Sequence, residues 1–168
     1  MLLYVLIPLL PVFSFLAIAI GGPRLGERSH RIGIPAMALS FTLAVVACVD
    51  VFVNGPITIS LYTLMQLGTL AIDVELYFDQ LSVLLLLLVT GISALVHIYS
   101  SRYMQGDTRY ARFFALISLF TFSMIMLLLS NNLLVLLVSW EVMGICSYLL
   151  IGFWAERTAA VRAATQAF

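Results

Sequence analysis

Residues 133–153, LLVLLVSWEVMGICSYLLIGF, decide the fold of this chain. At about 1.5 Å per residue, a helix of this length just crosses a hydrocarbon core of about 30 Å. Glu141 lies about 12 Å into such a helix, close to the middle of the membrane. A charged carboxylate there costs on the order of 2.5 to 3.5 kcal/mol unless it is neutral, paired or facing water. The stretch therefore predicts a membrane span that carries a proton-titratable side chain.

The composition of the whole chain predicts an integral membrane protein. Hydrophobic residues make up 63% of its 168 residues, charged residues make up 10%, and the mean hydropathy is +1.14. This is more apolar surface than a soluble core of that size could bury. All eight basic residues are arginine, and eight acidic residues balance them. Nucleic acid is not an expected partner, because binding it would need a basic face.

The pattern along the chain predicts an all-α bundle of five spans within a single membrane domain, residues 1–168. The spans are expected at residues 2–20, 32–53, 81–99, 113–129 and 133–153. Residues 57–78 differ, because ITISLY and IDVELYF alternate apolar with polar residues, a period of two that is typical of strands. We expect a short β-hairpin at the membrane surface between the second and third spans, with an irregular capping loop as the alternative.

Arginine is confined to alternate loops. All eight arginines follow the first, third and fifth predicted spans, and the loops after the second and fourth spans contain none. Positively charged loops stay on the cytoplasmic side of a membrane. The arginine-bearing loops are therefore expected inside, and the N-terminus and the hairpin are expected on the extracytoplasmic side.

Glu141 shares one helical stripe with Gly144, Tyr148 and Gly152. The glycines leave room for a neighbouring helix or for water, and Tyr148 adds a hydroxyl about 10.5 Å further along. An intramembrane acid can load a proton when desolvated and release it when a cation approaches. We therefore predict Glu141 to be a buried proton carrier and Tyr148 a candidate relay. The alternatives are a protonated glutamate that holds a neighbouring helix, and a tyrosine that only packs.

His97 is the second titratable candidate. It lies near the end of the third predicted span, about 13 to 15 Å from Glu141 in depth, so a link between them would need bridging water. It is either a proton relay at the cytoplasmic mouth or an interfacial histidine bonded to a carbonyl or a lipid headgroup. No predicted span contains lysine or arginine, so the sequence offers Glu141 no partner base.

Three motifs carry a resemblance to a known family. WEVMGICSYLLIGFW at 140–154, HIYSSRYMQGDTRYARFFA at 97–115 and FDQLS at 78–82 resemble the N-terminal part of the antiporter-like chain L of NADH:quinone oxidoreductase, also called NADH dehydrogenase subunit 5. The resemblance implies a proton-translocating subunit in the membrane arm of respiratory complex I. Its membrane glutamate matches Glu141, and its partner lysine lies in a later span.

The same resemblance implies the cofactors, partners and location. It implies no redox cofactor and no metal in this chain, with NADH, FMN, iron–sulfur clusters and quinone held by partner chains. The partners would be other membrane-arm subunits and the lipid bilayer. The location would be the bacterial cytoplasmic membrane or an equivalent energy-coupling membrane.

Two other functions stay open at this point. The large subunit of a multisubunit sodium/proton antiporter shares the fold and the glutamate, although GICSYLLIGFW favours the oxidoreductase. The third possibility is a structural or assembly module without transport of its own. Members of the family have well over a dozen spans, so the chain is expected to be the N-terminal part of a longer subunit, with residues 159–168 leading into a further span.

Overall fold

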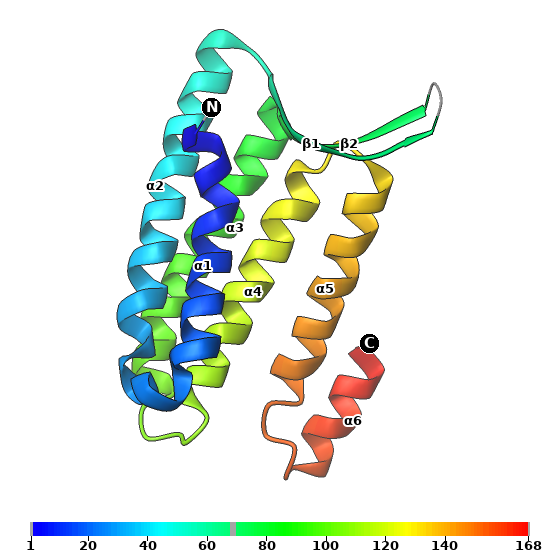
Figure 1. Ribbon diagram of the computed structural model, residues 1–168. Helices are drawn as coiled ribbons and strands as arrows, with labels where there is room; N and C mark the ends of the chain where they lie inside the picture. Colours follow the sequence, from blue (N-terminus) through cyan, green and yellow to red (C-terminus); the bar gives the residue numbers. More distant parts are fainter. Residues whose placement is uncertain (1, 68–69, 168) are drawn as a thin grey trace.

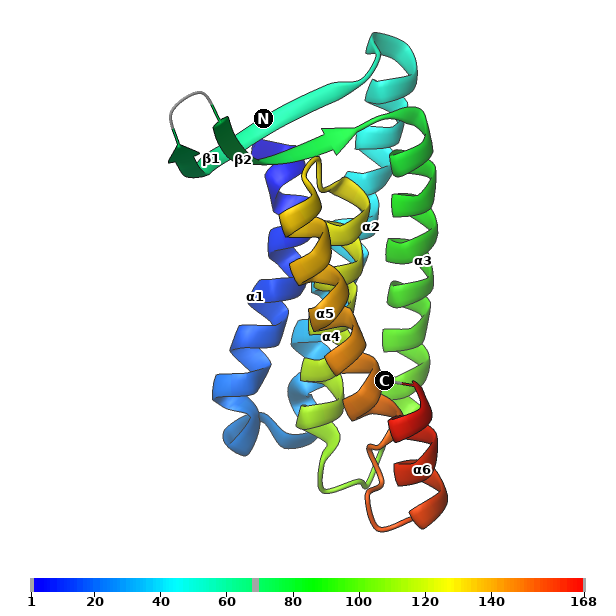
Figure 2. The same cartoon turned by 90° about the vertical axis from the view of Figure 1, so that its right-hand side faces the viewer.

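A computed structural model of the protein describes residues 2–67 and 70–167. Long helices stand side by side, and a hairpin crosses one end of them (Figures 1 and 2). The elements in chain order are α1 (Leu2–Leu25), the 3-10 helix η1 (Gly26–Ser29), α2 (His30–Asn54), β1 (Ile57–Leu67), β2 (Leu70–Phe78), α3 (Gln80–Tyr103), α4 (Tyr110–Leu129), α5 (Leu133–Ile151) and α6 (Thr158–Ala167).

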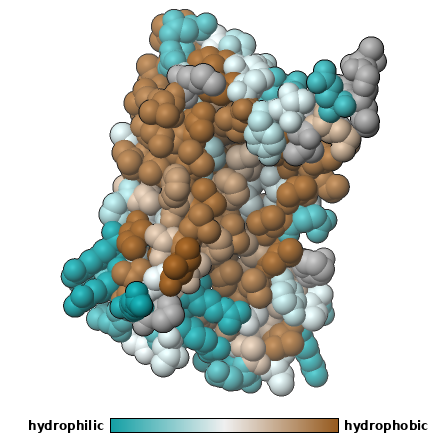
Figure 3. Space-filling view, in the orientation of Figure 1, coloured by the Kyte–Doolittle hydropathy of each residue, from teal (hydrophilic) through white to brown (hydrophobic). Residues whose placement is uncertain are grey.

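Five of these helices are long and apolar enough to cross a membrane, the same number as the predicted spans. Their candidate spans are Leu2–Gly22, Gly26–Asn54, Gln80–Tyr103, Tyr110–Leu129 and Leu133–Ile151. Apolar side chains cover most of the visible surface between two more hydrophilic ends (Figure 3). The described chain is therefore mostly helical, with five helices that could cross a membrane.

The connection between the first two spans is tighter than the sequence predicts. Residues 21–31 are predicted to form a loop, but α1 runs to Leu25 and α2 begins at His30. The chain reverses at Gly26, whose φ of 48° is in the left-handed region that glycine adopts without a steric cost. The single turn of η1 then feeds α2 directly.

The predicted hairpin at residues 57–78 is confirmed. β1 and β2 pair antiparallel from Ile57 opposite Phe78 to Leu67 opposite Leu70. The hairpin lies at the end of the bundle opposite the arginines and extends past α5 (Figure 1). Leu76 and Phe78 are fully buried, so β2 is anchored in the apolar core beneath it.

The hairpin also fixes where α5 begins. The side-chain amide of Asn131 donates to Oε2 of Glu75 at 2.8 Å, and that of Asn132 donates to the backbone oxygen of Asp73 at 2.8 Å. The side-chain oxygen of Asn132 in turn accepts a bond from the Val135 N–H at 3.0 Å and caps the helix. The two asparagines therefore join the α4–α5 turn to β2.

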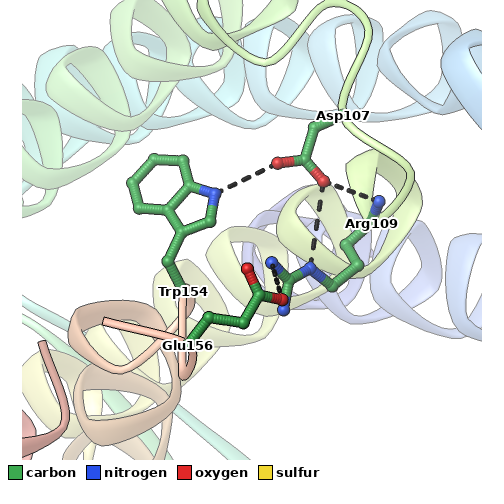
Figure 4. A network of polar contacts seen from close by, with 4 residues as sticks. All are labelled: Asp107, Arg109, Trp154 and Glu156. Atoms are coloured by element: carbon green, nitrogen blue, oxygen red, sulfur yellow. Dashed lines mark hydrogen bonds and ion pairs between the residues drawn. The ribbon is translucent and has the colours of Figure 1, made fainter. Parts of the chain in front are cut away.

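Polar contacts fix the other end of α5 (Figure 4). The indole N–H of Trp154 donates to Oδ2 of Asp107 at 3.1 Å, and Arg109 pairs with Glu156 at 3.3 Å. The Arg109 guanidinium also lies 5.3 Å from the centre of the Phe153 ring. The loop between α3 and α4 therefore holds the segment that joins α5 to α6.

The interior contains two apolar clusters, one towards each end of the bundle. The cluster beneath the hairpin includes Ile7, Val51, Leu76, Phe78 and Leu129. The cluster at the arginine-bearing end includes Ile18, Met104, Tyr110, Phe114 and Phe153. Hydroxyl groups and one imidazole, described below, lie at the levels between them.

Candidate functional site

The helix α5 lies at the side of the bundle, packed on α4 and, near its end, on α6 (Figure 1). Only 11% of its span is buried, compared with 50% of the α4 span. Its buried residues are Ser139 and Cys146, which mark the side that packs on α4. The opposite side of α5 is open.

Glu141 lies on the open side of α5. It is two residues from Ser139, about 200° around the helix, and its side chain is exposed. One turn along, a Cβ placed on Gly144 would have no neighbouring atom within 4 Å. The carboxylate therefore points away from α4 at mid-span, beside an equally open backbone.

The prediction that Glu141 is buried is wrong within the described helices. Most of the span of α5 has only α4 beside it, and one neighbour can cover only one side of a helix. The stripe itself follows the predicted spacing. Tyr148 is 37% exposed, as expected for a residue on the same side as Glu141.

Gly152 marks the end of the stripe and has a packing role. A Cβ there would come within 3.3 Å of the Ala164 Cβ on α6 and 3.2 Å of the Tyr148 backbone oxygen. A larger side chain would push α6 away. The open part of the stripe therefore runs from Glu141 to Tyr148.

His97 is fully buried inside the bundle, so its side chain does not reach lipid headgroups, one of the two partners predicted for an interfacial histidine. Its Nδ1 lies 2.8 Å from the backbone oxygen of Ser93, so the bond to a carbonyl is present. A Cβ on Gly33 of α2 would lie 3.1 Å from Cδ2 of the ring. The close approach of α2 at this glycine helps to seal the imidazole in the interior.

Hydroxyl groups from three helices surround the imidazole. His97 Nε2 lies 3.3 Å from Ser118 Oγ, which lies 3.1 Å from Ser14 Oγ, and Ser93 Oγ lies 2.6 Å from Thr121 Oγ1. A carbonyl can only accept, so Nδ1 carries the proton and donates to the Ser93 backbone oxygen, and Nε2 lies within hydrogen-bond distance of the Ser118 hydroxyl. The group joins α1, α3 and α4 through hydrogen bonds in the apolar interior.

The sequence does not reveal this group of hydroxyls. The spacing of Ser93 and His97 places them on one face of a helix, which is the only signal available. A hydroxyl in a membrane helix can bond to its own backbone, as Thr121 also does to the Ile117 oxygen at 2.8 Å. Polar residues in a span therefore do not identify their partners on other helices.

The structure does not bring His97 and Glu141 together. His97 lies where α3 meets α4, whereas Glu141 is on the side of α5 that faces away from α4. The candidate residues thus form two separate groups. One is the open side of α5 with Glu141 and Tyr148. The other is the buried His97 imidazole with the serine and threonine hydroxyls around it.

Two family models match the chain. Residues 64–114 match the N-terminus of chain 5 of NADH-ubiquinone oxidoreductase (complex I), and residues 130–168 match the transmembrane family of NADH:quinone oxidoreductase and the Mrp antiporter. The second match includes the whole of α5 and α6.

Curated relatives match almost the whole chain. NADH-ubiquinone oxidoreductase chain 5 of Allomyces macrogynus is 40% identical over 172 residues, which covers 98% of this chain and 26% of the relative. NADH-quinone oxidoreductase subunit L of Escherichia coli K12 is 40% identical over 163 residues, covering 95% of this chain and 27% of the relative. The chain thus spans about a quarter of the length of these relatives.

The fold also recurs in a solved structure. A chain of the membrane-bound sulfane sulfur reductase, an archaeal respiratory membrane complex, superposes with a TM-score of 0.83 at 18% identity, covering 97% of this chain and 32% of that chain. This similarity concerns the fold alone. On the sequence matches, the chain is similar to about a quarter of NADH-ubiquinone oxidoreductase chain 5 and of NADH-quinone oxidoreductase subunit L.

Proposed function

We propose that this chain is part of a proton-translocating membrane subunit of NADH:quinone oxidoreductase, and that Glu141 carries the proton. The observation that carries the proposal is the exposed carboxylate at mid-span on the open side of α5. A charge at that depth is costly in contact with lipid, and acids placed there are typically found at sites of ion or proton movement.

Glu141 needs a polar neighbour from outside the described helices. Among the described residues all arginines lie at one end of the bundle, so the spans offer no cation to the carboxylate. The relatives are about four times as long as this chain, which leaves room for a helix that bears a base. Approach and withdrawal of such a base would switch the acid between release and uptake of its proton.

Tyr148 and His97 are proposed to have different roles. Tyr148 shares the open side with Glu141, so its hydroxyl is the candidate relay towards the arginine-bearing end. His97 would serve as a relay only through the interior chain of Ser118 and Ser14, because it does not face Glu141. Transfer along the stripe therefore involves Tyr148 rather than His97.

The arginine-bearing end is proposed to face the cytoplasm, with the N-terminus and the hairpin on the extracytoplasmic side. The membrane would be the bacterial cytoplasmic membrane or an equivalent energy-coupling membrane. The partners would be other membrane subunits of a complex I-like assembly, and the hairpin, which extends past α5, is suited to contact one of them. NADH, FMN, iron–sulfur clusters and quinone would be bound by partner chains.

The test is Glu141→Gln in the complete, assembled enzyme. The variant keeps the shape of the side chain but cannot carry a proton, so we expect proton transfer along this path to slow by on the order of 10²-fold or more. NADH-driven proton uptake into vesicles, measured with a pH-sensitive dye against NADH oxidation, reports it. The control is Glu156→Gln, which removes an exposed carboxylate outside the span and should leave the proton-to-electron ratio unchanged.

A sodium/proton antiporter subunit is the second candidate, because the family model that matches α5 covers both the oxidoreductase and the Mrp antiporter. Sodium-dependent proton exchange without NADH oxidation would favour it. Failure of Glu141→Gln to assemble, with normal assembly of the control, would instead indicate a structural or assembly role for the glutamate.

A further inference from the structure

A groove of about 480 Å³ lies between α1 and α4 at the arginine-bearing end of the bundle. Thr108, Arg109 and Arg112 line its polar part, at the start of α4. Phe15, Ile18 and Leu116 line its apolar part, which continues into the spans. The groove therefore has a basic mouth at headgroup depth and an apolar continuation at the depth of acyl chains.

The two arginines at the mouth differ in their ion pairs. Arg109 is paired with Asp107 and Glu156. Arg112 is exposed and pairs with no carboxylate among the described residues. An anion at the mouth would therefore meet a guanidinium that no carboxylate of the described residues neutralises, next to the exposed Thr108 hydroxyl.

The groove between α1 and α4 is lined partly by small residues. Ala19 and Gly22 of α1 face Ala111 and Ala115 of α4 along the groove. A Cβ on Gly22 would come within 3.3 Å of the Ala111 Cβ, so the two helices close together there. The groove is bounded at this contact and open elsewhere. This shape fits a long, thin ligand better than it fits a helix.

We propose that this groove binds an anionic phospholipid, with its phosphate at Arg112 and Thr108 and one acyl chain along Phe15, Ile18 and Leu116. A free phosphate would use only the basic mouth, and a wholly apolar helix would use only the apolar part. An anionic phospholipid uses both parts. The proposal does not depend on the function proposed for Glu141.

The test measures retention of phosphatidylglycerol and phosphatidylcholine by the complete protein, titrated in detergent and followed by native mass spectrometry. Arg112→Gln should weaken phosphatidylglycerol binding by about fivefold, which corresponds to about 1 kcal/mol for one basic residue at the membrane surface. Arg28→Gln is the matched control, because Arg28 is exposed at the same end but lies outside the groove. It should bind as the wild type does.

A second pair of variants tests the apolar part. Ala19→Phe should block the groove and lower phosphatidylglycerol retention, whereas Ala17→Phe, on an exposed part of α1 outside the groove, should not. Equal weakening by Arg112→Gln and Arg28→Gln would overturn the proposal in favour of a diffuse charge effect. The proposal would also be overturned if both lipids were retained equally or if Ala19→Phe had no effect. Displacement of the bound lipid by inorganic phosphate alone would contradict it as well. Thermal unfolding midpoints confirm that each variant is folded.

Discussion

At the scale of single residues, the two titratable side chains in the interior of the spans differ in their exposure. His97 is completely enclosed and its ring nitrogens lie near Ser93 and Ser118, whereas Glu141 is exposed on a helix with an open side. An enclosed, hydrogen-bonded group is expected to stabilise the native state. The role proposed for the exposed acid at mid-span depends on the group that approaches it.

Replacing His97 with Leu should therefore affect stability more than transport. The change removes the hydrogen bond between His97 and Ser118 while Ser118 keeps Ser14 as a partner, so we expect a loss of about 0.5 to 1.5 kcal/mol in the free energy of unfolding. Denaturation in detergent measures this loss. The proton-to-electron ratio of enzyme that remains folded should match that of the wild type.

The matched control is Ser101→Ala, which removes a hydroxyl that donates to the Ile98 backbone oxygen of its own helix. It should change stability much less than His97→Leu. If His97→Leu instead lowered the proton-to-electron ratio while stability stayed the same, His97 would be a relay in transport.

The sequence is informative about Glu141 and much less so about His97. Helical periodicity places Glu141 and Tyr148 on one side of α5, and this relation depends only on local geometry. Burial depends on which helices surround a residue. The hydroxyls that enclose His97 come from positions as far apart as Ser14 and Ser118, so no local pattern identifies them.

At the scale of elements, the start of α3 is defined by a reciprocal cap. Asp79 accepts a bond from the Ser82 N–H at 2.8 Å, and the Asp79 N–H donates to Ser82 Oγ at 2.8 Å. The bond from the Ser82 N–H is the main reason why the pKa of Asp79 is below its ordinary value. This capping box is placed where β2 ends, so it sets both the end of the hairpin and the start of the span.

Asp79→Ala should lower the free energy of unfolding by about 1 kcal/mol, the usual cost of losing an N-cap. Asp79→Asn should lose less, because an asparagine oxygen can still accept the bond from the Ser82 N–H. Thermal unfolding followed by circular dichroism measures both. Equal loss in the two variants would show that the charge, rather than the cap, is what matters.

The loop between α3 and α4 should make stability depend on acidity. The pKa of Asp107 lies below its ordinary value, chiefly because the Arg109 N–H donates to it and also because the Trp154 indole does. The stabilisation from these bonds is present above the unfolded-state pKa of about 3.9 and is lost as the pH falls through the lower folded-state value. Thermal unfolding between neutral pH and that range measures it.

Asp107→Asn should remove this part of the acid-induced loss. Glu156→Gln is the control, since it leaves the bonds to Asp107 in place and should keep the pH dependence. If the two variants showed the same pH profile, another carboxyl group would be responsible.

The elements themselves are largely predictable, whereas their connections are not. Span length and alternation identify the five helices and the hairpin, because both are properties of a continuous stretch. The ties at the ends of α5, from Asn131 to Glu75 and from Trp154 to Asp107, join residues separated by 56 and 47 positions. Such pairs become apparent only once the helices are placed.

At the scale of the whole molecule, the two ends of the bundle differ in chemistry. One end carries every arginine, and the other carries the hairpin with its carboxylates and asparagines. The orientation proposed above follows from this difference. It can be tested without any assay of transport.

Single cysteines introduced at the two ends should be labelled from opposite sides of the membrane. Thr58 on β1 and Gln105 in the α3–α4 loop are both exposed. In vesicles with the cytoplasmic face inside, a membrane-impermeant maleimide should label Thr58→Cys and leave Gln105→Cys unlabelled until the vesicles are opened. The unmodified protein, whose Cys48 and Cys146 lie within the spans, provides the background. Labelling in the reverse order would contradict the proposed orientation.

The restriction of positive charge to arginine at one end has a consequence for proteolysis. Trypsin cleaves only after lysine or arginine, so every site that it could use in these residues lies at the same end of the bundle. Digestion from the hairpin side should therefore leave this region intact, and digestion from the other side should separate fragments that contain whole spans from short peptides between neighbouring arginines.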